Sequence, residues 1–164
     1  VVMTRDELQA AYPGVFTAYE FVIPSYGWMI TRREAAENRI QSLQVFAATV
    51  SISIPGAAKV LVPTIQFSDW RFVLAGLLYV SLMAAGLIAR LRGGVVLANP
   101  RIHQEKWLHF SEWEFKKNSV FWAAEHFRIN SIEIQGKSNV AVWMTATFLG
   151  ELVLLLAWIA TAQG

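Results

Sequence analysis

The chain has 164 residues, of which 55% are hydrophobic and only 16% are charged. Soluble domains carry about 25% charged residues, so this composition indicates a membrane protein rather than an ordinary soluble enzyme. The net charge of +2 is small, and the absence of cysteine excludes disulfides, thiolate nucleophiles and cysteine-based metal sites. We therefore expect an all-α integral membrane protein with three membrane helices and a cytoplasmic helical layer.

Residues 1–42 are expected to form cytoplasmic or interfacial helices. The stretch "YEFVIPSYGWMI" is apolar and aromatic but contains Pro24 and Gly27, so we expect a short interfacial or re-entrant piece there. Thr31 is followed by Glu34 three residues later. This is the spacing of a capping box, which predicts that a basic helix begins at Thr31.

Residues 43–90 are expected to form a transmembrane helical hairpin. Its second segment, Phe72–Ala89, carries no charge and is flanked by arginines. Its first segment, 43–62, is more polar and contains Pro55, but neighbouring helices in a bundle satisfy the backbone groups that a proline frees. We expect both segments to cross the membrane.

Residues 91–138 are expected to form a cytoplasmic amphipathic helical region. Asn99 precedes Pro100, which predicts a helix start. Four apolar residues recur every seven positions and predict a shared helix face. They are Leu108, Phe115, Trp122 and Ile129.

The same region holds the chain's three histidines and many of its aromatic and basic residues. His103, His109 and His126 match no metal-ligand spacing that we recognise, so we expect neither metal nor cofactor. The aromatic and basic residues are typical of nucleic-acid surfaces, but interleaved glutamates favour a helix against the inner leaflet. The expected partner is therefore the lipid bilayer and not nucleic acid.

Residues 139–164 are expected to form a C-terminal transmembrane helix, in which Glu151 is the one charged residue. Charged side chains inside a membrane usually face a protein interior or a water-filled cavity. Glu151 is therefore either a pore-lining, proton-binding or cation-binding group, or a neutral acid that hydrogen-bonds to another helix. Lys59 is either its ion-pair partner or a side chain that extends to the outer interface.

Two further groups of residues have predicted roles within the spans. The polar candidates for a pore or a partner contact, beside Glu151 and Lys59, are Ser51 and Ser53. The candidates for close helix packing are small residues spaced by four: Ser81, Ala85 and Ala89.

The basic residues predict the orientation in the membrane. They gather before the first span and between the second and third spans, whereas the C-terminal tail has none. The positive-inside rule then places the N-terminus and residues 91–138 in the cytoplasm and the C-terminus outside the cell membrane.

The layout resembles that of the SLATT-type small bacterial membrane effectors. It consists of a basic helix with "RREAAENRI", a two-span hairpin with a very short outer loop and a cytoplasmic helical region, over residues 28–130. The resemblance implies a location in the inner membrane of a bacterial cell and pore formation in nucleotide-signalled antiphage defence, and it transfers no functional residue. Our first hypothesis is a non-enzymatic, homo-oligomeric pore or channel-like effector. The alternative is a non-catalytic accessory subunit of a larger membrane complex, and an enzyme with a His/Glu site ranks third.

Overall fold

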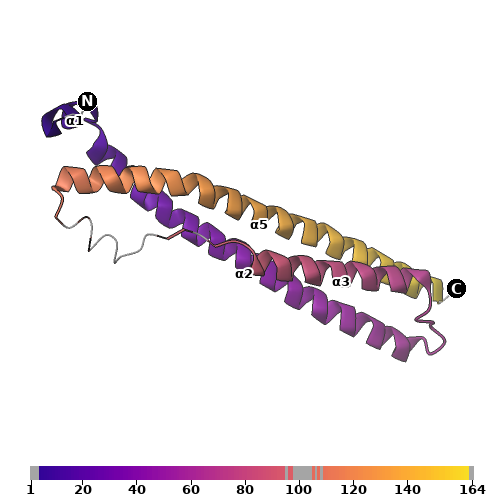
Figure 1. The fold of residues 1–164 in the computed structure, drawn as a ribbon. Helices are drawn as coiled ribbons and strands as arrows, with labels where there is room; N and C mark the ends of the chain where they lie inside the picture. The colour runs from indigo at the N-terminus through magenta and orange to yellow at the C-terminus, as the bar shows by residue number, and fades with distance from the viewer. Residues whose placement is uncertain (1–3, 95, 98–104, 106, 108, 163–164) are drawn as a thin grey trace. The chain divides into compact units, whose positions relative to one another are not determined.

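The computed structural model describes residues 4–94, 96–97, 105, 107 and 109–162, and all of its regular elements are helices. They are α1 (Arg5–Ala11), α2 (Val15–Leu61), α3 (Trp70–Leu91) and α5 (Glu112–Ala162), as labelled in Figure 1. This confirms the all-α fold for the described part of the chain. The predictions for Asn99, Pro100, His103 and Leu108 lie outside the described residues.

Side-chain caps fix where several helices begin. Thr4 and Glu7 form a capping box at the start of α1. Asp69 accepts a hydrogen bond of 2.8 Å from the backbone N–H of Arg71 at the start of α3. Ser111 accepts a hydrogen bond from the Glu114 N–H, and the Glu114 carboxylate accepts one from the Ser111 N–H. These bonds satisfy backbone donors that have no partner within a helix's first turn.

The expected interruption at Pro24 and Gly27 is wrong, because α2 runs without a break from Val15 to Leu61. A proline inside a helix removes one hydrogen bond, and a helix of 47 residues retains many others. Thr31 and Glu34 lie in the middle of α2 and cap nothing. The backbone of α5 is likewise continuous across residues 138 and 139, the expected boundary between the cytoplasmic region and the third span.

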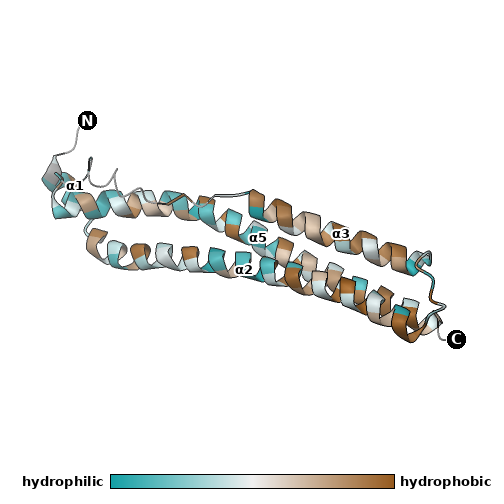
Figure 2. Ribbon diagram, turned by 90° about the horizontal axis from the view of Figure 1, so that it is seen from below, coloured by the Kyte–Doolittle hydropathy of each residue, from teal (hydrophilic) through white to brown (hydrophobic). Residues whose placement is uncertain are grey.

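The chain divides into two compact units, which we describe separately. The first contains residues 1–33 and 94–134, and the second contains residues 34–93 and 135–164. In the second unit the C-terminal part of α2, all of α3 and the C-terminal part of α5 pack together around two apolar clusters. Figure 2 shows hydrophobic residues concentrated along these helix segments.

Helices α2, α3 and α5 are each long and apolar enough to cross a membrane. At about 1.5 Å per residue, the 22 residues of α3 extend for roughly 33 Å, which matches a hydrocarbon core of roughly 30 Å. The predicted membrane-spanning lengths therefore exist as helices in the structure.

Candidate functional site

Two polar side-chain pairs join α2 and α5 in the second unit. Glu37 pairs with Lys137, and fourteen residues further along both helices Ser51 pairs with Glu151. Because both pairs are separated by the same number of residues, these segments of α2 and α5 run parallel and in register. Helix α3 runs the opposite way, because Ile40 and Ala47 share a cluster with Ala89 and Leu82, whereas Ala58 shares one with Ala75.

The pair of Ser51 and Glu151 lies inside the second unit. Glu151 is 1% exposed, and its Oε1 is hydrogen-bonded to the Ser51 hydroxyl. Its Oε2 is buried and has no hydrogen-bond partner within the described residues. The sequence marked both residues as candidates, and the structure brings them together.

Lys59 and Ser53 lie away from Glu151. The ammonium group of Lys59 donates to the backbone carbonyls of Pro63 and Ile65, at 2.6 and 3.4 Å, and lies over the ring of Phe67. It therefore binds the loop that follows α2. The Ser53 side chain is on the exposed side of α2.

The ion pair of Glu37 and Lys137 lies nearer the N-terminal side of the same helix pair. The Lys137 side chain is 6% exposed and the Glu37 side chain 33% exposed. A lysine buried to this degree needs a counter-charge, because an unpaired buried ammonium is costly. Glu37 supplies that counter-charge from α2.

Close packing of α3 against α2 and α5 centres on Gly86. A Cβ atom added there would lie 2.6 Å from the Gln44 amide nitrogen and 3.0 Å from the Met144 methyl carbon. The Gln44 side chain fills this space and donates to the backbone carbonyl of Met83 at 3.2 Å. Gly86 is therefore the position on α3 that needs the smallest side chain.

The row of small residues on α3 is divided between environments. Ala89 is buried in the first apolar cluster and Ala85 is partly buried against it. Ser81 is exposed. Two of the three predicted packing residues thus contact neighbouring helices within the unit.

The outer faces of the three helices in the second unit differ in polarity. On α5 the large exposed side chains are apolar, as in Trp143, Leu149, Val153 and Leu156. On α3 the exposed face is also mainly apolar. On α2 the exposed face also carries apolar residues, among them Val45, Ile52 and Val60, but polar residues recur along it: Asn38, Gln41, Ser42, Thr49 and Ser53. We call these five residues the polar face of α2.

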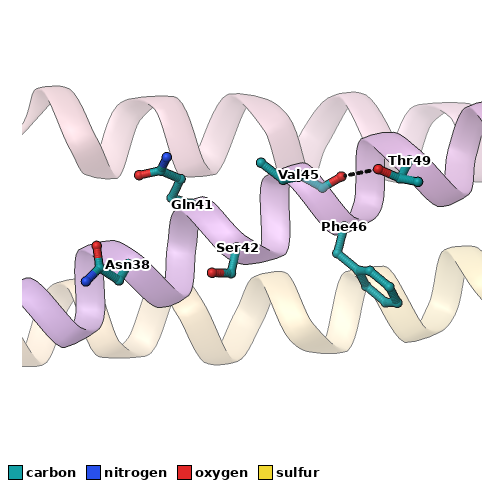
Figure 3. Close-up of a pocket in the computed structure, with 6 residues that line it drawn as sticks. All are labelled: Asn38, Gln41, Ser42, Val45, Phe46 and Thr49. Atoms are coloured by element: carbon teal, nitrogen blue, oxygen red, sulfur yellow. Dashed lines mark hydrogen bonds between the residues drawn. The ribbon is translucent and has the colours of Figure 1, made fainter.

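A shallow groove of about 670 Å³ follows the N-terminal part of this polar face. Figure 3 shows that its lining residues all come from α2, with Val45 and Phe46 among the polar side chains. The Thr49 hydroxyl donates to the Val45 carbonyl at 2.9 Å. The amides of Asn38 and Gln41 and the hydroxyl of Ser42 extend along the same surface.

The first unit holds a separate buried polar cluster around Asn130. The Asn130 side chain accepts from the Val96 N–H at 3.0 Å and donates to the Val96 carbonyl at 3.2 Å. The Tyr26 hydroxyl also donates to that carbonyl, and its ring packs edge-on against Trp122. This cluster attaches the segment after α3 to α5.

The sequence analysis did not identify the buried seven-residue repeat on α5 that contains Lys137 and Glu151. On α5, six buried residues recur every seven positions: Ala123, Asn130, Lys137, Met144, Glu151 and Trp158. A seven-residue repeat of buried residues is typical of helices in coiled-coil-like packing. The polar residues within this repeat could have revealed it in the sequence. The apolar repeat that we predicted, which contains Trp122 and Ile129, lies one residue earlier on the helix, and Ile129 is 44% exposed.

Within the described residues, no group of three or more histidine, cysteine or acidic side chains is arranged to hold a metal ion. Comparison with known proteins found no matching family, no matching curated protein and no matching solved structure.

Proposed function

We propose that the chain is a homo-oligomeric membrane pore or channel-like effector, in which the polar face of α2 lines or seals the path. The observation that carries this proposal is the contrast between the outer faces of the second unit. Those of α3 and α5 are suited to lipid, whereas α2 exposes amides and hydroxyls on a helix long enough to span.

The physical argument concerns the cost of placing polar side chains in hydrocarbon. Moving an unpaired amide or hydroxyl from water to an apolar medium costs roughly 2–7 kcal/mol. Thr49 lowers this cost by bonding to its own helix. The amides of Asn38 and Gln41 precede the expected start of the span at residue 43, so they extend the polar face toward the end of the path, where water or another copy around a closed symmetry axis satisfies them.

The parallel arrangement of α2 and α5 fits this proposal. Helix α3 comes between α2 and α5 in the sequence and runs antiparallel to both. If each helix crosses the membrane once, α2 and α5 therefore enter it from the same side. The layout resembling SLATT-type effectors also points to pore formation.

The absence of cysteine makes a direct test possible. The purified protein is reconstituted in planar bilayers, and single cysteines are introduced by Thr49→Cys on the polar face and Val153→Cys on the apolar face of α5. A charged, water-soluble methanethiosulfonate reagent is then added while conductance is recorded. We expect wild-type conductance, a change of conductance in the Thr49→Cys variant, and no change in the Val153→Cys variant.

Two results would count against the proposal. An electrically silent wild-type protein would refute the pore. Conductance that the reagent alters only in the Val153→Cys variant would show that the path runs along another face.

A further inference from the structure

The hydrogen bonds around Ser51 require more protons than the serine can supply. Its Oγ lies 2.7 Å from the Ala47 carbonyl and also contacts Glu151 Oε1. A serine hydroxyl has one hydrogen, and a carbonyl has none. If Glu151 were ionised, two acceptors would compete for the single Ser51 hydrogen. A protonated Glu151 resolves this, because it donates to Ser51 Oγ while Ser51 donates to Ala47.

The surroundings of Glu151 supply no cation. On α5 the sequence contains no other charged residue between Lys137 and Ala162. On α3 there is none between Arg71 and Arg90, and the titratable side chain in that stretch is Tyr79, which packs against the first apolar cluster. On α2 the charged residues nearest to Ser51 in the sequence are Arg39, which is exposed twelve residues earlier, and Lys59, which donates to backbone carbonyls of the following loop.

A proline removes a hydrogen-bond donor at the same level of α2. Residue 55 is a buried proline, so the Ser51 carbonyl lacks the N–H that residue i+4 normally donates in a helix. Glu151 Oε2 also has no partner within the described residues. The region therefore contains more hydrogen-bond acceptors than donor hydrogens. A proton bound to Glu151 adds a donor and needs no cavity.

We propose that Glu151 and Ser51 form a proton-binding site between α2 and α5. In its occupied form the Glu151 carboxyl donates to Ser51 Oγ, and Ser51 donates to the Ala47 carbonyl. Loss of the proton leaves a buried carboxylate, and Ser51 must turn its hydrogen from Ala47 toward it. The location of this site within a membrane, and its effect on the path along α2, rest on the proposed function.

Regulation follows from the position of Ser51 on α2. The polar face lies on the outer side of the same helix, so a change in the contact between α2 and α5 would alter the path. We assign the packed arrangement of α2 and α5 in the structure to the proton-bound form. Deprotonation is therefore expected to change conductance through the orientation of α2.

The first test uses N,N′-dicyclohexylcarbodiimide, an apolar reagent, on the full-length protein in its own membranes. The O–H of a protonated carboxyl adds across a C=N bond of the reagent, and the O-acylisourea rearranges to an N-acylurea without a leaving group. We expect one adduct per chain, mapped by mass spectrometry to Glu151. It should be lost in Glu151→Gln and retained in Glu37→Gln. Adducts in wild-type protein that leave Glu151 unmodified would overturn the proposal.

The second test is infrared spectroscopy of the folded protein, which keeps the proposal falsifiable if Glu151→Gln fails to fold. The carbonyl stretching band of a protonated carboxylic acid should be present in wild type and absent in Glu151→Gln. Ser51→Ala removes one hydrogen bond from the acid, so the band should shift to higher frequency. A wild-type spectrum without this band, or a band that does not respond to Ser51→Ala, would overturn the site.

These outcomes separate the site from the pore. A Glu151-dependent band in a protein with no conductance would retain the proton site and refute the pore. Conductance in a protein that lacks the band would support the pore and refute the proton site.

Discussion

Gly86 provides the sharpest test of how α3 packs against its neighbours. Substitution by alanine would place a Cβ atom 2.6 Å from the Gln44 amide nitrogen and 2.7 Å from the adjacent amide carbon. Gln44 must then move, and its hydrogen bond to the Met83 carbonyl is lost. The Met144 methyl group, 3.0 Å away on α5, limits the space into which the side chains are able to relax.

The expected cost combines three effects. Overpacking costs roughly 1–3 kcal/mol. The lost hydrogen bond costs roughly 0.5–1.5 kcal/mol. Alanine is favoured over glycine inside a helix by roughly 0.5–1 kcal/mol. The clashing Gln44 atoms are the end of a flexible side chain, so overpacking is expected to cost about 1 kcal/mol, and the free energy of unfolding should fall by about 0.5–2 kcal/mol in Gly86→Ala.

Gly76 is a matched control on the same helix, because a Cβ atom there meets nothing within 4 Å. Gly76→Ala should keep only the helix-propensity gain of roughly 0.5–1 kcal/mol. Unfolding of both variants is followed by tryptophan fluorescence in detergent. A second variant, Gln44→Ala, removes the clashing amide, so Gly86→Ala should cost less in that background. Equal stability changes at Gly86 and Gly76 would refute this packing.

Two further predictions concern the ion pair and the buried tyrosine. Glu37→Ala leaves the buried Lys137 ammonium without its counter-charge and should lower the free energy of unfolding by about 1–3 kcal/mol; Lys137→Met should cost less, because the Glu37 that remains is one-third exposed. The thermal unfolding midpoints of the two variants check this, and a lower midpoint for Lys137→Met would contradict it. Burial raises the pKa of the Tyr26 hydroxyl, and the Asn130 hydrogen bond offsets part of this effect. The folded first unit therefore holds this proton more tightly than the unfolded chain, whose tyrosines titrate near a pKa of about 10. Stability that is present below about pH 10 should be lost as the pH rises through the folded pKa. Alkaline unfolding of Tyr26→Phe should show less of this loss, and equal pH profiles would contradict the assignment.

The apolar patterns were sufficient to predict three long helices and an all-α fold. Their lengths were not predicted, because a proline or glycine usually ends a helix in isolation. In α2, Pro24 and Pro55 each remove a single donor from a helix of 47 residues, and the neighbouring turns continue. The boundary between the cytoplasmic region and the third span was placed from the apolar pattern, and α5 continues across it as one helix.

Glu151 was identified from its charge, whereas its partner was not. The sequence predicts a contact with another helix without identifying that helix, and the structure places Ser51 of α2 against Glu151. A sequence gives the spacing within each helix but not the register between two helices. That register depends on tertiary packing. The equal spacing of the Glu37–Lys137 and Ser51–Glu151 pairs can be recognised only once the structure has identified both pairs.

Of the polar face of α2, Thr49 and Ser53 lie within the expected span and the other three residues precede it, and the exposure of all five was not predictable. Ser51 and Ser53 are two residues apart, and only the structure shows that Ser51 faces α5 whereas Ser53 is exposed. Ser51 therefore belongs to the proposed proton site, and Ser53 belongs to the proposed path on the opposite side of α2.

Native mass spectrometry of the protein, extracted gently from its own membrane, tests the proposed homo-oligomer most directly. We predict one species that contains several identical chains, with the polar faces of α2 toward one another. A single copy bound to unrelated polypeptides would contradict the homo-oligomeric pore and support an accessory subunit of a larger complex.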